Sequence, residues 1–411
     1  LSDYWQPEDL NTFVYYEHTD RRDKIELTKT RVGDSSSMEL PVYDASTWKT
    51  NSLELGSQWK SGDESIQRFG FFLGMNNETD ARRVNIKAHR CFPASLCLGE
   101  QLGNDPPVTN KWSDADVWGG TKPAEGEIAT VRYNWRMELD EDTPMLDVLF
   151  VDGLLWIDPT ATRTIKARHI YVRHGTLQIG NRTDGVRFSG KATIELHGVT
   201  ASTTTTKDQA IEAGDRTIVN TGTLDFFGES VATSMTRLLA PVDPSGDGNT
   251  DTVTLTAAHI SDWSVGDRIA FAPTSFNRLE GEDALITAIN TETGVVTLDK
   301  NLTNYHYGDA SDDTVAGVDM RCEVVHLTRN IVIKPVDDTW GSTVRTGDLV
   351  ISGESIYRYG TAYIDGVEFA EGGQKDTQRA ALRFIEASGS IAGSYVKNSA
   401  FHNGGAAAIW I

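Results

Sequence analysis

The chain has 411 residues, of which 38 are lysine or arginine and 59 are aspartate or glutamate, so its net charge is −21. This acidity argues against a broad nucleic-acid surface, because such a surface needs clustered cations to displace phosphate counterions. It argues equally against docking on anionic lipid. No apolar run reaches the roughly 18 residues that a membrane-spanning helix needs, so we expect no membrane span in this sequence.

The first 108 residues differ in composition from the rest of the chain. They are rich in aromatic and charged residues, and they contain an alternating run at 84–88 (VNIKA) that is typical of a strand. Cys91 and Cys97 are six positions apart, close enough for a disulfide around a short loop. The alternative is that these two cysteines and Cys322 are free cytosolic thiols. We predict a small β-sandwich-like domain over residues 1–108 that ends in the Cys91/Cys97 loop.

Short alternating runs continue after residue 111, for example at 176–179 (TLQI), 192–196 (ATIEL), 253–256 (VTLT) and 295–298 (VVTL). Glycine, asparagine and aspartate separate these runs, and glycine at repeated corners permits stacked backbones to approach closely. Helical periodicity is scarce. The sequence therefore predicts a nearly all-β protein.

The stretch at 243–251 (DPSGDGNTD) has oxygen-bearing side chains at alternate positions, which makes Asp243, Asp247, Asn249 and Asp251 candidate calcium ligands. Calcium takes six to eight oxygens, and the glycines would let the loop wrap around an ion. The bidentate glutamate of an EF-hand is missing, so a plain hairpin loop is the favoured alternative. Calcium is the only cofactor that the sequence suggests. We expect no zinc, because there is no HExxH or CxxC motif, and we expect His306 to be a hydrogen-bonded structural residue.

An internal repeat lies near the C-terminal end of the sequence. Residues 363–373 (YIDGVEFAEGG) align with 395–405 (YVKNSAFHNGG), and residues 380–385 (AALRFI) align with 406–411 (AAAIWI). A repeated strand, Gly-Gly corner and strand is typical of a solenoid, and a right-handed parallel β-helix is the natural candidate. In that arrangement Phe369 would stack over Phe401, and Ile385 would stack over Ile411.

Several ordered motifs resemble the G8 domain, a family named for its glycines: residues 112–120 (WSDADVWGG), 175–180 (GTLQIG), 188–198 (FSGKATIELHG), 263–269 (WSVGDRI) and 323–331 (EVVHLTRNI). The family includes the fibrocystins and the cell-surface and secreted hyaluronan-degrading proteins. The resemblance covers residues 111–411 and implies a right-handed parallel β-helix exposed outside the cell. We expect a G8 domain at 111–230 that starts the β-helix, a β-rich insertion or continuation at 231–335, and β-helix coils at 336–411.

Compartment and completeness must be inferred indirectly. Three Asn-X-Ser/Thr sequons, at Asn77, Asn181 and Asn301, lie in polar stretches where a glycan could be accommodated. Together with the acidity and the close cysteine pair, they favour a secreted or cell-surface glycoprotein. Leu1 is not an initiator methionine, and residues 406–411 read as a buried strand without a cap, so we interpret the sequence as an internal piece of a longer chain.

The resemblance leaves a choice between an enzyme and a non-enzyme. In the hyaluronan-degrading branch, a histidine-rich strand follows a Gly-Gln pair; here Gly373-Gln374 is present, but residues 380–386 contain no histidine. Glycoside hydrolysis needs two carboxyl groups about 5–9.5 Å apart. The candidate catalytic residues are Glu368, Arg383 and Glu386, and the alternative is that they are solvated side chains on an acidic surface.

We favour a non-enzymatic extracellular structural or recognition protein built as a rigid β-helical rod. The first alternative is a polysaccharide hydrolase, for which Arg321, Arg329, Arg379 and Arg383 could supply a basic cleft for an anionic glycan. The second is a glycan- or protein-binding module without turnover. The expected partners are extracellular glycans or proteins, or further copies of the chain, and not nucleic acid.

Overall fold

The computed structural model describes residues 108–132, 135–173, 175–199, 214–246, 248, 250–309, 317–347, 360–385 and 393–411 with side chains, and six further strands as backbone. Cys91, Cys97, Asn77 and Glu386 lie outside the residues described with side chains. The chain divides into two compact units, residues 1–100 with 350–357 and residues 101–349 with 358–411. The described part is all-β apart from three short 3-10 helices, η6 (Ala115–Trp118), η7 (Ala257–His259) and η8 (Arg278–Glu280). It contains no helix long and apolar enough to cross a membrane.

The first unit contains a four-stranded antiparallel sheet with the strand order β2-β1-β3-β4. Its strands are β1 (Asn11–His18), β2 (Lys24–Leu27), β3 (Gln67–Gly74) and β4 (Arg82–Ala88). The run at 84–88, expected to be a strand from its alternation, lies within β4. Two further short strands, β23 (Leu349–Ile351) and β24 (Ser355–Arg358), form a two-stranded sheet.

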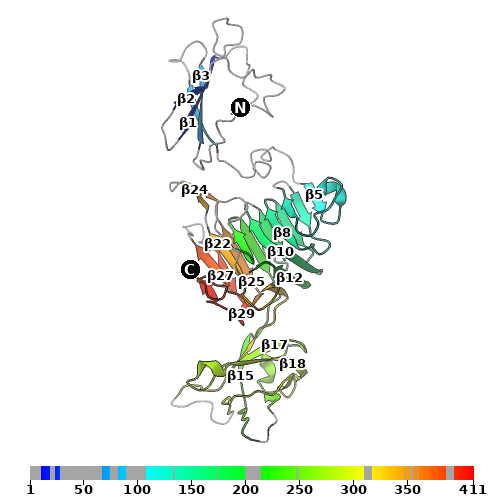
Figure 1. Cartoon of the computed structure of the whole chain (residues 1–411). Helices are drawn as coiled ribbons and strands as arrows, with labels where there is room; N and C mark the ends of the chain where they lie inside the picture. The colour runs from blue at the N-terminus through cyan, green and yellow to red at the C-terminus, as the bar shows by residue number, and fades with distance from the viewer. Residues whose placement is uncertain are drawn as a thin grey trace. The chain divides into compact units, whose positions relative to one another are not determined.

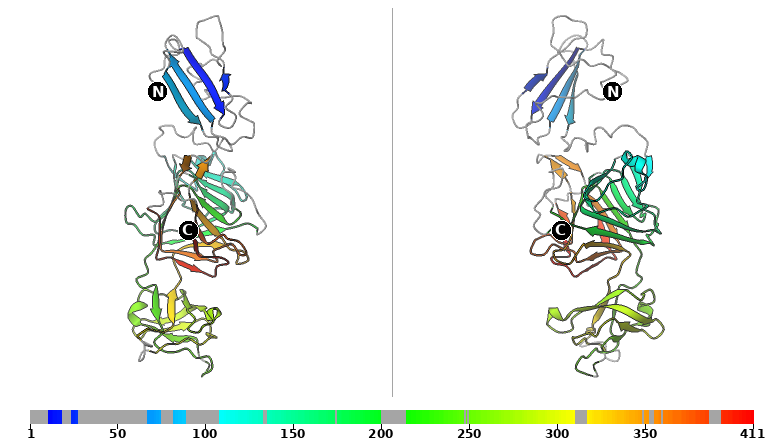
Figure 2. Two further views of the ribbon diagram at one scale, coloured as in Figure 1. Left: turned by 90° about the vertical axis from the view of Figure 1, so that its left-hand side faces the viewer. Right: turned by 45° about the vertical axis from the view of Figure 1, so that its right-hand side comes forward.

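The second unit is dominated by parallel strands that occupy three faces, visible in Figure 1 and from two further sides in Figure 2. Face A consists of the first half of β10 (Thr162–Val172), β12 (Lys191–Leu196), β21 (Ile331–Pro335), β26 (Val367–Ala370) and β29 (Ala400–His402). Face B consists of β6 (Ile128–Val131), β8 (Leu146–Val151), the second half of β10, β13 (Thr217–Asn220), β22 (Thr343–Gly347), β27 (Leu382–Ile385) and β30 (Ile409–Trp410). Face C consists of β5 (Val108–Lys111), β7 (Trp135–Glu138), β9 (Leu154–Ile157), β11 (Thr176–Ile179), β14 (Thr223–Phe227), β25 (Thr361–Asp365) and β28 (Tyr395–Lys397).

From β10 onward the chain visits faces A, B and C in that order, and then repeats the order. Faces A and B are two wings of one sheet that curls at β10: residues 162–167 pair with β12, and residues 169–172 pair with β13. Face C is a separate sheet. We call these three faces together the parallel stack.

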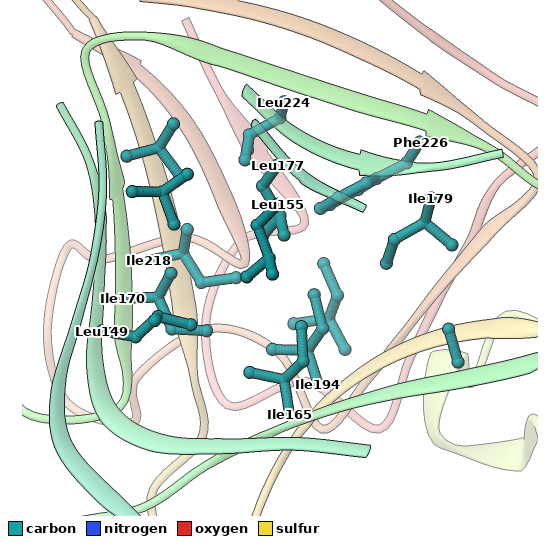
Figure 3. Packing of buried hydrophobic residues seen from close by; sticks show 14 of the residues in the cluster. Leu149, Leu155, Ile165, Ile170, Leu177, Ile179, Ile194, Ile218, Leu224 and Phe226 are labelled. Atoms are coloured by element: carbon teal, nitrogen blue, oxygen red, sulfur yellow. The ribbon is translucent and has the colours of Figure 1, made fainter. Parts of the chain in front are cut away.

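The core of the parallel stack is made of columns of apolar side chains (Figure 3). On face C, Leu155, Leu177 and Leu224 are register partners on successive strands, and all three are fully buried. Columns from faces A and B project toward them in Figure 3. Because side chains alternate along a strand, parallel in-register pairing places one apolar residue over the next on the same side of each sheet. Each fully buried aliphatic side chain contributes about 1.5–3 kcal/mol to stability.

The stacking expected from the internal repeat is confirmed in its first half. Phe369 and Phe401 are register partners, and their rings stack with centroids 4.4 Å apart. The second half of the expectation is wrong by one residue. Arg383 pairs with Trp410, so Ile385 does not lie over Ile411. The backbone hydrogen bond from Ala381 N to Ala407 O fixes this register, and a shift of one residue exchanges the inward and outward side chains.

The corner between faces B and C at Gly175 requires a residue without a side chain. A Cβ added at Gly175 would lie 2.0 Å from the carbonyl oxygen of Gly153 on the preceding strand connection. No relaxation of a side chain relieves this clash, because the obstructing atom is backbone. Glycine is therefore required here for close approach of stacked backbones.

An antiparallel module lies between β14 and β21. It contains β15 (Met235–Arg237), β16 (Thr252–Thr254), β17 (Arg268–Phe271), β18 (Glu282–Asn290), β19 (Val295–Leu298) and β20 (Glu323–His326), in the order β15-β20-β17-β18-β19-β16. It has an apolar core of its own. Hydrogen bonds of Asn330 join the two ends of the module to each other and to the parallel stack. The Asn330 side chain accepts a hydrogen bond from Glu229 N at 2.9 Å and donates to the carbonyl oxygens of Phe188 and Gly190.

Candidate functional site

Arg383, one of the candidate residues from the sequence, lies on the outward side of face B. Its neighbours in β27, Leu382 and Phe384, contribute to the core, so alternation directs Arg383 away from it. Its register partners are Arg345 on β22 and Trp410 on β30. Trp410 is 45% exposed, whereas Arg383 is partly buried. Two cations and an exposed aromatic ring therefore follow one another along this side of the sheet.

Arg383 has no acidic partner within the described part of the chain. Its buried Nε atom lacks any hydrogen-bond partner there. Burial, and then the positive charges of Arg379 and Arg345, lower the pKa of the Arg383 guanidinium to about 10. Arg379 is held nearby, because it donates to Gln374 Oε1 at 3.0 Å, and Gln374 is itself fully buried. The fold thus gathers three cations in an otherwise acidic protein.

Only two of the four arginines proposed for a basic cleft come together. Arg379 and Arg383 influence one another electrostatically. Arg321 lies in the antiparallel module, where it donates to both carboxylate oxygens of Asp319 at 3.0 and 2.8 Å. The sequence analysis missed Arg345. Val344-Arg345 pairs in register with Leu382-Arg383, but this pairing is not visible in the sequence because residue identity does not repeat between the two turns.

Arg329, the fourth, is buried where the antiparallel module joins the parallel stack. Its Nε donates to the carbonyl oxygen of Asn398 at 2.6 Å, and its guanidinium donates to His326 Nδ1 at 3.1 Å. His326 Nε2 in turn donates to Asp267 at 2.8 Å. Burial lowers the pKa of Arg329 even though Glu368 and Asp267 oppose that effect. This residue therefore serves the junction and does not line a cleft.

Glu368 belongs to the same junction. One of its carboxylate oxygens accepts a hydrogen bond from Arg329 N at 2.8 Å, and the other pairs with His402 Nε2 at 3.0 Å. Both oxygens are therefore used by the fold. Asp365, three residues before Glu368 in the sequence, accepts a hydrogen bond from Asn398 Nδ2 at 2.8 Å. Glu386, the candidate partner of Glu368, lies outside the described residues.

In the antiparallel module, the side chains of a cysteine, a histidine and a glutamate that are far apart in the sequence lie next to one another in space. Cys322 Sγ lies 3.7 Å from His306 Nδ1, and His306 Nε2 lies 3.1 Å from Glu282. The order resembles a nucleophile, base and orienting carboxylate. However, Cys322 and His306 are at most 1% exposed, and burial raises the pKa of the Cys322 thiol to about 12. His306 Nδ1 also lies 3.1 Å from the carbonyl oxygen of Ala272, so both ring nitrogens have hydrogen-bond partners, as expected for this residue.

The candidate calcium ligands are only partly described. Asp247 and Asn249 lie outside the described residues. Asp243 accepts hydrogen bonds from the backbone and hydroxyl of Ser245, and Asp251 accepts one from the Thr252 hydroxyl. Within the described residues, no group of three or more histidine, cysteine, aspartate or glutamate side chains is arranged to hold a metal ion.

Two of the three sequon asparagines are described. Asn181 lies in a turn and bonds Asp184 with both ends of its amide, at 2.7 and 3.0 Å. Asn301 is exposed, and its side-chain oxygen accepts from Thr250 N at 3.2 Å. Asn301 therefore has the more open amide nitrogen of the two.

Comparison with known proteins supports the resemblance found in the motifs. Residues 117–239 match the G8 domain. Fibrocystin-L of Mus musculus is 32% identical over 270 residues, which is 64% of this chain, and fibrocystin-L of Homo sapiens is 30% identical over 275 residues, which is 65%. A protein of Dictyostelium discoideum is 29% identical over 238 residues, or 56% of this chain and 21% of that protein. The match spans 6% of the length of each fibrocystin-L. By motifs, domain match and relatives alike, the chain contains a G8 domain over residues 117–239 and is similar to fibrocystin-L.

Proposed function

We propose that this chain is a non-enzymatic recognition part of an extracellular protein, and that its scaffold is a right-handed parallel β-helix. The repeated order of faces A, B and C, with parallel register on every face, supports the scaffold. Parallel crossover connections are right-handed in about 98% of cases, which supports the hand. An experimental density map of the chain tests this part, and a left-handed path would contradict it.

Such a scaffold acts as a rigid rod. Each strand is hydrogen-bonded to the next along three faces, so outward side chains keep fixed spacings. A strand spacing of about 4.8 Å separates successive side chains of one column. Partners can then be recognised by several residues at once without ordering a loop on binding, which lowers the entropic cost of binding.

The observation that carries the recognition role is the partly buried guanidinium of Arg383 on the outward side of face B, beside Arg379 and its register partner Arg345. The Arg383 side chain is not part of the apolar core, and its guanidinium is not neutralised by any described carboxylate. Residues that violate local rules of stability are typical of functional sites. Similarity to fibrocystin-L and the match to the G8 domain support an extracellular setting.

The test is binding of the labelled 411-residue chain to unpermeabilised cells and to isolated extracellular matrix. We expect saturable binding that Arg383→Gln weakens and that Arg321→Gln leaves unchanged, because Arg321 is paired with Asp319 elsewhere. A folded chain that binds no extracellular material would contradict the recognition role. New reducing ends in the bound material would show turnover and contradict the non-enzymatic assignment.

A further inference from the structure

One histidine where the antiparallel module joins the parallel stack has ring nitrogens that face groups of opposite kind. His326, on β20, is 4% exposed, and its ring packs against that of Trp263 with the centroids 5.1 Å apart. Its Nε2 lies 2.8 Å from the carboxylate of Asp267, an acceptor. Its Nδ1 lies 3.1 Å from the guanidinium of Arg329, which can only donate. The ring in this junction is therefore neutral, with its proton on Nε2 and a lone pair on Nδ1.

Arg329 connects this ring to the parallel stack. Its Nε donates to the carbonyl oxygen of Asn398 at 2.6 Å, and its backbone N donates to Glu368 at 2.8 Å; both partners belong to the stack. The same guanidinium donates to His326 Nδ1 and to the carbonyl oxygens of His326 and Thr328. Because a guanidinium is planar and rigid, its Nη1 cannot move away from His326 without shifting its Nε from Asn398.

The other charged groups around the junction do not replace this contact. Asp262 and Glu368 attract Arg329 through their charges. His402 pairs with the second carboxylate oxygen of Glu368 at 3.0 Å. Among the described residues, Arg329 is the hydrogen-bond partner that His326 Nδ1 has. The state of the junction therefore depends on what occupies this one nitrogen.

We propose that the junction is a pH-sensitive switch, in which a proton and Arg329 compete for Nδ1 of His326. Histidine side chains in general change charge between about pH 5 and 8. When the ring is protonated, Nε2–H keeps its bond to Asp267, but Nδ1–H points at a cationic donor, so the guanidinium must leave. The contact is closed with the neutral ring and opens as the pH falls. Opening that takes up one proton becomes up to about tenfold more favourable per pH unit.

The two apolar cores need not change when this contact breaks. The module and the stack each have a core of their own, and Asn330 joins the two ends of the module through Glu229 N. With the Arg329 contact broken, the module stays attached by its connecting segments and is free to change its orientation on the stack. The protein then presents the module differently in neutral and in mildly acidic surroundings. This switch does not depend on the recognition role proposed above.

The experiment is hydrogen exchange of the 411-residue chain at pH 7.5 and pH 5.5, corrected for the intrinsic effect of pH on exchange rates. We expect the protection of residues 326–330 to fall by about tenfold or more at the lower pH, while β11 and β17 keep theirs. His326→Gln cannot take up a proton and should show equal protection at both pH values. The matched control is His259→Gln, a change at a histidine of the same module that bonds Thr236, and it should keep the original response.

Nitrogen NMR of the histidine-labelled chain tests the starting state, because His326 should be the neutral Nε2–H tautomer at pH 7.5. An imidazolium at that pH would overturn the proposal. Unchanged protection of residues 326–330 in the original chain would overturn it as well, and neither measurement needs a variant. A loss of protection that persists in His326→Gln, or that affects β11 and β17 equally, would also contradict a local switch.

Discussion

The outward side of face B is built differently at its two ends. On the early strands, Phe150 and Tyr171 are buried with their ring centroids 6.0 Å apart, and Arg173 lies over Phe150 while pairing with Asp152. On the late strands, the corresponding side is occupied by Arg345, Arg383 and Trp410. One sheet thus holds a buried arginine paired with an acid and a partly buried arginine that no acid among the described residues pairs with.

This difference distinguishes an arginine that stabilises the parallel stack from an arginine on its surface that does not. Arg173 is 3% exposed and donates to both oxygens of Asp152, so its charge is neutralised within the fold. Arg383 adds a desolvated charge and gains no partner among the described residues. Arg173 therefore belongs to the architecture, whereas Arg383 is the residue that we propose for recognition.

The largest expected effect comes from breaking the paired end. Asp152→Ala would leave the Arg173 guanidinium buried and unpaired, and we expect a loss of about 3–5 kcal/mol in the free energy of unfolding. Arg383→Gln should change it by less than about 1 kcal/mol, because no described acid is abandoned. Chemical denaturation of both variants measures the contrast. Equal losses would show that the two arginines play the same structural role.

Backbone packing offers a second comparison of the two ends. Gly175→Ala should cost about 2–3 kcal/mol, because its Cβ would meet the backbone oxygen of Gly153 at 2.0 Å. In Gly393→Ala, next to β28, the added Cβ meets atoms of the Tyr363 side chain, of which the nearest is the hydroxyl oxygen at 3.3 Å, and this side chain can move. We expect less than about 0.5 kcal/mol there. Hydrogen exchange of the amides in β11 and β28 reports each effect locally, and a tolerant Gly175 would contradict close stacking at that corner.

A smaller effect extends the comparison to paired charges in the antiparallel module. Burial alone would raise the pKa of Glu282, but hydrogen bonds from Thr303, Asn304 and His306 outweigh it and lower the pKa below the ordinary 4.5. A carboxyl group with a lowered folded pKa stabilises the fold above its unfolded pKa, and this contribution is lost as pH falls through the folded value. Glu282→Gln should therefore lower the free energy of unfolding at pH 7 by less than about 1 kcal/mol, because solvent screens this partly exposed group. The variant should also lose less stability than the original chain as the pH falls.

Unfolding curves of Glu282→Gln and of Glu292→Gln, a change at an exposed position of the same module, measure this effect between pH 7 and pH 3. The control should keep the acid dependence of the original chain. A Glu282→Gln variant with unchanged stability and unchanged acid dependence would remove Glu282 from the set of structural charges.

The sequence was a good guide where structure is local and periodic. The alternating runs predicted strands, and the aligned Tyr, Phe and Gly residues predicted that Phe369 stacks on Phe401. The same alignment wrongly placed Ile385 over Ile411. The connections that follow Gly373 and Gly405 differ in length, so the alignment of the next strands needed a gap, and its position was wrong by one residue. Identical residues in a repeat do not fix register when the intervening loops differ; the backbone hydrogen bonds do.

The candidate site was only half predictable for a related reason. Arg383 was found because its strand could be aligned with a family motif, whereas Arg345 comes from the preceding turn, where residue identity does not repeat. The row of Cys322, His306 and Glu282 was not anticipated at all. These residues come from separate segments of the module, and their proximity follows from antiparallel pairing that no local pattern encodes.

The way the antiparallel module begins and ends has a consequence for how such proteins diversify. Asn330 bonds the amide of Glu229, so the chain leaves the stack and returns to it at one spot, and the long excursion between these residues closes on itself. Closing a longer loop adds little entropic cost, about 0.6 kcal/mol for each doubling of its length. A module of another size or specificity can therefore replace this one between Glu229 and Asn330, while the parallel strands of the stack keep their pairing.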